Sequence, residues 1–87
     1  MWAVATDVDI SDTGAARDLL PNVVSIVRQA PGFVAGHWVQ LDEGHGTSLV
    51  VFDTEENARA GMPKEGDSPG PGVIFSRVRV GEVAAHA

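Results

Sequence analysis

The sequence contains no cysteine and no tyrosine. Without cysteine the chain has no disulfide framework, no thiol nucleophile and no thiolate metal ligand. This absence suits a reducing compartment. Only three histidines are present, and their wide separation in the sequence lacks the spacing of metal ligands: His37, His45 and His86. We therefore expect neither a metal centre nor catalysis by a thiol.

Basic residues are also scarce, with six Lys and Arg against twelve Asp and Glu and a net charge of −6. A surface that binds nucleic acid needs a basic face to replace counterions, and an anionic membrane surface needs one as well. The first ten residues lack a basic segment, and Asp7 and Asp9 interrupt their apolar run, so we expect neither a signal peptide nor a spanning helix. The sequence thus predicts a soluble, cytoplasmic protein with no nucleic acid or membrane partner.

The length of 87 residues predicts one domain, residues 1–87. The hydrophobic fraction of 44% is ordinary for a globular protein. A chain this short buries a smaller share of its surface than a larger protein does, so it gains stability from oligomerisation.

Hydrophobic periodicity predicts a first strand over residues 2–10, where every second residue is apolar or threonine. Apolar residues then recur at three- and four-residue spacing between Ala16 and Ala30, which is typical of a helix. Pro21 lies inside this stripe and predicts a kink or two helical pieces. Pro31-Gly32 ends the helix.

The next two strands, over residues 33–41 and 47–52, are joined by the glycine-rich turn DEGHG and predict a hairpin. Alternation places five residues of the second strand on one face: Phe33, Ala35, His37, Val39 and Leu41. Residues 49–52 are apolar on both faces, which is typical of a strand covered on both sides. The chain's own helices cover one side, and we expect a second copy to cover the other.

A short second helix begins in DTEENARAGM, where Asp53 and Glu56 have the spacing of a capping box. Residues 63–72, rich in proline, glycine and serine, predict a mobile loop that could serve as a lid. Residues 73–80 form the last strand. The order β-α-β-β-α-β predicts an α+β, ferredoxin-like fold with both helices on one face of a four-stranded antiparallel sheet.

Four features together span nearly the whole chain. They are an alternating N-terminal strand, a helix ending in PGF at 31–33, Trp38 on the second strand, and an apolar strand running into VFDTEENARA at 51–60. In this combination the chain resembles the small antibiotic-biosynthesis-monooxygenase-like proteins of the dimeric α+β barrel superfamily. The resemblance implies that two sheets pack face to face as a homodimeric α+β barrel with the helices outside.

Members of this family include cofactor-independent monooxygenases acting on quinol-like aromatics, haem-degrading enzymes and proteins of unknown activity. The resemblance therefore implies no bound cofactor. The haem-degrading branch uses an Asn on the first strand and a His on the second helix, but residues 2–10 contain no Asn and residues 54–62 no His. Trp38 is the one residue that matches the polar and aromatic lining of the monooxygenase cavities.

His37 and Trp38 are neighbours in the sequence, but strand alternation directs them to opposite faces of the sheet. His37 is a candidate base or hydrogen-bond donor in a cavity between the two sheets, since imidazole titrates near neutral pH. The alternative interpretation is a histidine whose hydrogen bonds are satisfied by a polar neighbour at the dimer interface. Trp38 is a candidate ligand contact, or else core beneath a helix.

Arg77 and Arg79 are assigned to the same face of the last strand as Val73 and Phe75. They are candidates for binding an anionic ligand, or for pairing with Asp7 or Asp9 on an adjacent strand. His45 lies in a turn and His86 near the C-terminus, and neither is a strong candidate.

Two functions follow from these observations. The first is binding of a small, aromatic molecule in the barrel cavity, with cofactor-independent oxygenase-like chemistry. The second is a non-catalytic binding or regulatory dimer whose interface is packed solid. A ligand-sized cavity reached by His37 or Trp38 favours the first, and fold alone does not choose between them.

Overall fold

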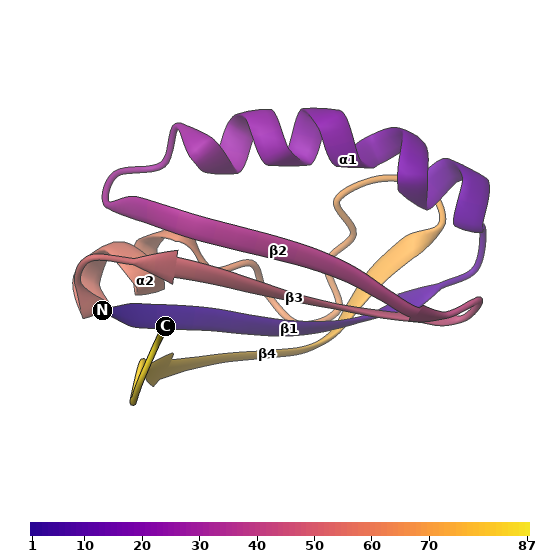
Figure 1. The fold of residues 1–87 in the computed structure, drawn as a ribbon. Coiled ribbons are helices and arrows are strands. Elements are labelled where there is room, and N and C mark those ends of the chain that lie inside the picture. Colours follow the sequence, from indigo (N-terminus) through magenta and orange to yellow (C-terminus); the bar gives the residue numbers. More distant parts are fainter.

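The computed structural model describes all 87 residues and has the element order β-α-β-β-α-β (Figure 1). The four strands form one antiparallel sheet in the order β2-β3-β1-β4. This confirms the predicted ferredoxin-like α+β fold. The elements are β1 (Trp2–Ile10), α1 (Thr13–Arg28), β2 (Phe33–Asp42), β3 (His45–Phe52), α2 (Glu55–Gly61) and β4 (Val73–Glu82).

The hydrophobic core lies between the sheet and the helices, toward the end of the sheet that α2 covers. Its buried members come from β1, β3, β4 and α2: Val4, Val50, Phe52, Ala58 and Val78. Phe52 is only 1% exposed and is the largest fully buried side chain. Val27 and Ala30, at the C-terminal end of α1, pack against the same cluster. Both helices therefore cover the same face, as the crossover rule predicts.

Helix α1 begins at an N-cap formed by Asp12, whose carboxylate accepts a hydrogen bond from the Ala15 amide at 3.0 Å. The helix then continues through Pro21 without interruption, so the prediction of two helical pieces was wrong. Pro21 removes one backbone donor, but its ring is exposed and the turns on either side remain paired. No residue of α1 is fully buried, although its apolar stripe faces the sheet.

Helix α2 is capped by Thr54 rather than by the predicted Asp53. The Thr54 hydroxyl accepts from the Asn57 amide at 3.1 Å, and Asp53 instead accepts from the Asn57 side-chain amide at 2.8 Å. The two residues are adjacent and both are good N-caps, so the sequence pattern alone did not place the first turn.

Two irregularities in strand pairing change which side chains share a face. The register shifts between Phe33 and Ala35, and Phe33 packs on the core side, away from His37. In β4, Phe75 pairs with Val8 whereas Arg77 pairs with Asp7, so one extra residue lies between them. Arg77 and Arg79 therefore lie opposite to Val73 and Phe75, and the predicted shared face was wrong.

The face of the sheet away from the helices, which we call the open face, carries exposed hydrophobic side chains. Val39 and Leu41 of β2 are 48% and 62% exposed, Leu49 of β3 is 43% exposed, and Ile74 of β4 is 51% exposed. Charged residues accompany them, since Asp7 and Asp9 alternate with the core residues of β1.

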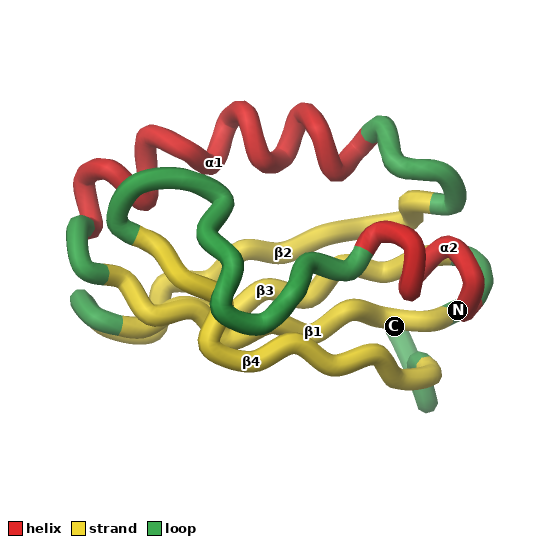
Figure 2. The backbone as a smooth tube through the Cα atoms, turned by 180° about the vertical axis from the view of Figure 1, so that it is seen from behind, coloured by secondary structure: helices red, strands yellow, loops and turns green.

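The loop between α2 and β4 rises from the sheet toward α1 (Figure 2). It was predicted to be a mobile loop, and several hydrogen bonds join it to β4. Glu65 accepts from the Val78 amide at 3.0 Å, and the Gly66 amide donates to the Phe75 carbonyl at 2.7 Å. Ser68 bonds to the carbonyls of Gly70 and Val73.

None of the helices is long and apolar enough to cross a membrane.

Candidate functional site

A cavity of about 390 Å³ lies between α1 and the sheet. Ten of its seventeen lining residues are hydrophobic, so its walls are mainly apolar. The helix contributes Leu19, Leu20 and Val23, and the sheet contributes residues of all four strands. Small-molecule sites in proteins are commonly concave, mainly apolar and about 300–1,000 Å³ in volume. The cavity is therefore large enough to hold a small organic ligand.

The cavity arises because α1 and α2 pack differently against the same face. The ring of Phe52 and helix α2 fill the space over one end of the sheet. Over the other end, β3 presents only Gly46 and Ser48 to the helix, and these small residues leave room beneath α1. Pro69 of the long loop closes one side, and Gly70 lies so close to Leu19 that a Cβ on it would be 2.5 Å from a leucine methyl.

Two hydroxyl groups lie on the sheet side of the cavity. Thr6 and Ser48 are paired in register on β1 and β3, are 4% and 8% exposed, and are hydrogen-bonded to each other through their side chains. Each hydroxyl has one donor and two acceptor positions. One O–H is used within the pair, and the other remains able to donate to an oxygen or nitrogen of a ligand.

Trp38 lines the cavity from β2 and also packs against the hydrophobic core. It is the register partner of Ser48, and its indole ring folds over Gly36. A Cβ on Gly36 would lie 2.7 Å from Cη2 of Trp38, so a side chain there would displace the ring. Trp38 thus forms a wall between the core and the cavity, and it can contact a ligand with its apolar ring.

Arg17 of α1 and Gln40 of β2 lie at the solvent side of the cavity. The guanidinium of Arg17 donates to Oε1 of Gln40 from Nη2 at 2.6 Å and from Nε at 3.0 Å. Nε2 of Gln40 donates in turn to the Asp42 carbonyl at 3.2 Å. These bonds hold a positive charge at the mouth of an apolar cavity.

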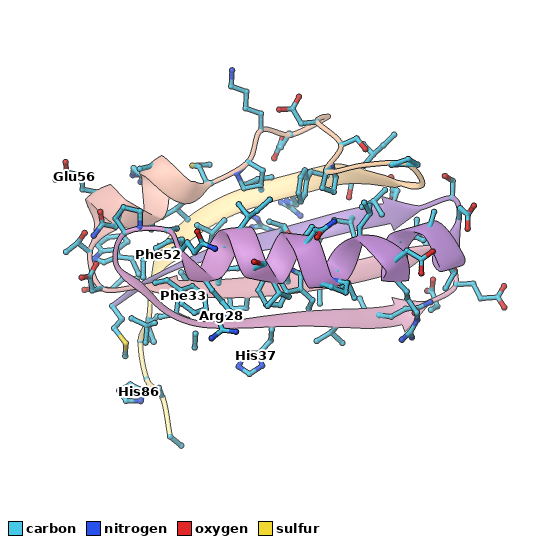
Figure 3. All side chains as sticks on the ribbon, turned by 90° about the horizontal axis from the view of Figure 1, so that it is seen from above. Arg28, Phe33, His37, Phe52, Glu56 and His86 are labelled. Carbon is cyan, nitrogen blue, oxygen red and sulfur yellow. The ribbon has the colours of Figure 1, made fainter.

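The other residues singled out from the sequence lie elsewhere. His37 is exposed on the open face and projects past β2, away from α1 (Figure 3). Arg77 and Arg79 are also exposed and lie opposite Asp7 and Ala5 in the register. Neither arginine has a carboxylate within ion-pair distance. Of the four predicted residues, only Trp38 lines the cavity beneath α1. His37, Arg77 and Arg79 lie on the open face, which is the face predicted to meet a second sheet.

His45 forms a contact that the sequence reasoning missed. Its Nδ1 lies 2.9 Å from Oδ1 of Asp42, across the turn between β2 and β3, and its Nε2 lies 4.0 Å from Oδ1 of Asp9. The hydrogen bond to Asp42, then the Asp42 charge, raises the pKa of His45 above its ordinary value of 6.5. The hydrogen bonds from His45 and from the Gly44 amide lower the pKa of Asp42 below 3.8.

This pair predicts a pH dependence that NMR can measure. Because the His45 pKa is raised, its contribution to stability is complete below pH 6.5 and is lost as pH rises through the raised pKa. The Asp42 contribution is present above pH 3.8 and is lost as pH falls through the lowered pKa. Asp42→Asn should bring the His45 pKa back toward 6.5, whereas Asp18→Asn, which removes an equal charge on α1, should leave it raised. An unchanged pKa in Asp42→Asn would contradict the assignment.

The chemistry that the cavity supports is limited by its side chains. Arg17 is its only ionisable lining residue, and the lining includes no His, Asp or Glu. General acid–base catalysis requires a titratable group within hydrogen-bond reach of the reacting proton, and arginine stays protonated. The mainly apolar lining, with Arg17 at its mouth, is suited to binding a molecule that has an apolar body and one polar end. Nor do three or more His, Cys, Asp or Glu side chains gather in a group that could hold a metal ion.

No protein-family model matches the chain, and a search of the curated proteins finds no match. The fold is thus shown by the order and pairing of its own strands and helices, as a small ferredoxin-like α+β domain.

Proposed function

We propose that this protein is a homodimeric small-molecule-binding protein whose ligand lies beneath α1 in each subunit. The observation that carries the proposal is the cavity of about 390 Å³ between α1 and the sheet. Its apolar walls, the flat ring of Trp38 and the Thr6–Ser48 hydroxyl pair fit a molecule of one or two rings that bears a polar group.

The open face supports the dimeric part of this proposal. Strands about 4.8 Å apart that rise about 3.3 Å per residue give four strands of about nine residues a flat area of roughly 570 Å². Side chains that project from the sheet add accessible area to this flat estimate, which brings it close to the roughly 800 Å² per partner of a standard interface. The face also carries both acidic Asp7 and Asp9 and basic Arg77 and Arg79, so a second copy supplies the opposite charges. A two-fold dimer uses the same patch twice.

Filling the cavity tests the binding function. Ala16 lies in the cavity lining, and Ala16→Leu adds three carbon atoms to that space. We expect this change to weaken binding of 2-naphthamide, a neutral two-ring probe, by at least about tenfold, which corresponds to about 1.4 kcal/mol. Isothermal titration calorimetry measures the affinity, and native mass spectrometry of the unmodified protein reports any molecule retained from the cell.

The control for this experiment is Asn22→Leu, which places a leucine on an exposed position of the same helix. It should bind the probe as the unmodified protein does. Equal affinities for Ala16→Leu and Asn22→Leu, or no binding by the unmodified protein, would overturn the proposal.

A second candidate function is cofactor-independent oxygenation of an aromatic ligand. It is favoured by the position of Trp38 beside the hydroxyl pair in a largely apolar cavity, together with the resemblance stated above. Such a reaction would convert a phenolic ring and O₂ into a quinone and water, and the substrate would supply the electrons. Because His37 lies on the open face, the cavity offers no base for it, so the phenol would have to ionise unaided.

Oxygen uptake separates the two functions. With 1-naphthol as the probe, uptake of O₂ matched by formation of 1,4-naphthoquinone supports the oxygenase. Binding without uptake of O₂ supports a non-catalytic dimer. Such a dimer would be a binding or regulatory protein with a solidly packed interface between the sheets.

A further inference from the structure

The positive charge of Arg17 at the mouth of the cavity indicates which chemical class of ligand can bind beneath α1. Arg17 lies in the second turn of α1, and its guanidinium reaches across to β2, where Gln40 accepts both of its bonds. Gln40 is itself held by the Asp42 carbonyl. The guanidinium is therefore positioned by two elements of the fold, the helix above the cavity and the edge strand below it.

The charge of Arg17 has no carboxylate partner. The only ion pairs within 4.0 Å in the molecule involve His45 and Arg59. A guanidinium has five N–H donors, and the bonds to Gln40 use two of them. Three donors remain for a ligand, and the planar arrangement of such donors suits the two oxygens of a carboxylate.

We propose that the ligand is a monoanionic carboxylic acid with an apolar body of one or two rings, which rests on the proposed binding function. Its carboxylate pairs with Arg17 at the mouth, and its apolar body lies beneath α1 against Trp38. A single cation in the lining favours one negative charge over the several charges of a phosphate ester. A cationic ligand would be repelled by Arg17, and the lining has no carboxylate that could stabilise the ligand's charge.

The inner end of the cavity adds one further requirement on the ligand. The Thr6–Ser48 pair offers one hydroxyl donor in an otherwise apolar part of the lining. A ligand whose far end carries a carbonyl, ether or phenol oxygen satisfies this donor, whereas a purely hydrocarbon end leaves it unpaired.

Two probes of the same size test the charge preference directly. 2-Naphthoic acid and 2-naphthamide differ only in the group at the polar end, which is a carboxylate in one and a neutral amide in the other at pH 7. Titration calorimetry at low salt should show that the acid binds roughly two- to fivefold more tightly, the range for an ion pair at an exposed position. The preference should shrink as KCl is added.

Arg17→Met should reduce the preference for the acid to about one and leave the affinity for the amide nearly unchanged. Arg17→Lys, which keeps the charge without the planar pair of donors, should retain part of the preference. The matched control is Arg28→Met, at the last residue of α1 (Figure 3) and outside the cavity lining, which should keep the full preference.

The outcomes separate this inference from the binding function on which it rests. Equal affinity for acid and amide in the unmodified protein, with both weakened by Ala16→Leu, would overturn the acid preference and leave the binding function in place. A preference that survives in Arg17→Met would also overturn it. Binding of neither probe would overturn both proposals.

Discussion

Leu49→Asp is expected to convert the proposed dimer into a monomer. Leu49 lies on β3, one of the two central strands, and it is 43% exposed on the open face. In a two-fold dimer of sheets, this residue from each copy becomes buried near the centre of the interface. Burying two like-charged carboxylates there costs several kcal/mol in lost hydration and mutual repulsion, so the dissociation constant should rise at least about a hundredfold. Sedimentation velocity over a dilution series measures this constant.

The control is Ile26→Asp, which introduces the same charge at an even more exposed apolar residue. Ile26 is 72% exposed but lies on α1, away from the open face. This variant should dimerise as the unmodified protein does. A protein that is monomeric before any substitution at micromolar concentration would contradict the dimer, and so would a Leu49→Asp variant with an unchanged dissociation constant.

Phe52→Ala is expected to be the most destabilising single truncation in the core. The Phe52 side chain is 1% exposed, and Gly61 of α2 lies so close that a Cβ there would be 2.8 Å from its ring. Removing a buried phenylalanine ring costs about 3–5 kcal/mol, because apolar burial is lost and a cavity remains. Native domains have total stabilities of about 5–15 kcal/mol, so a large part of the folding free energy would be lost.

Urea unfolding at one fixed protein concentration measures this effect, because association changes apparent stability. Phe33→Ala is the matched control, since it removes the same ring from a half-buried position at the edge of the core. It should cost clearly less. Equal losses in the two variants would show that Phe52 does not anchor the core as described.

The arrangement of strands and helices could be predicted because each element has its own periodicity. The alternation of β1 and the helical stripe of α1 are visible in the sequence, and the turn between β2 and β3 is short enough to require a hairpin. The errors have local causes. Pro21 was predicted to kink α1 or to divide it in two, and the division was wrong because a single missing hydrogen bond is tolerated where the ring faces solvent.

The extra residue in β4 could not be predicted, since no glycine or proline marks it, and it reversed the facing of Arg77 and Arg79. Alternation counted from Val73 loses its phase at such a bulge. The same limit applies to Phe33, where the shift follows directly after the Pro31-Gly32 stop. Strand alternation is therefore a reliable guide to facing only within a regular stretch of pairing.

The cavity could not be predicted because it depends on how far α1 lies from the sheet. Its polar residues did leave a signal in the sequence. Thr6 is the one polar residue on the core side of β1, and Ser48 is its counterpart on β3. A buried hydroxyl pair among valines is a departure from the apolar pattern. Arg17, by contrast, is one of six basic residues scattered through the sequence. Only its hydrogen bonds to Gln40 on β2, seen in the structure, distinguish it from the other five.

We infer that a small molecule with an apolar body binds beneath α1 rather than on the open face. Methyl NMR spectra of the protein titrated with 2-naphthamide test this claim directly. Methyl signals of Leu20 and Val23 should shift with added probe while those of Leu41 and Leu49 stay in place. Shifts of Leu41 and Leu49 alone, or no shifts at all, would contradict it.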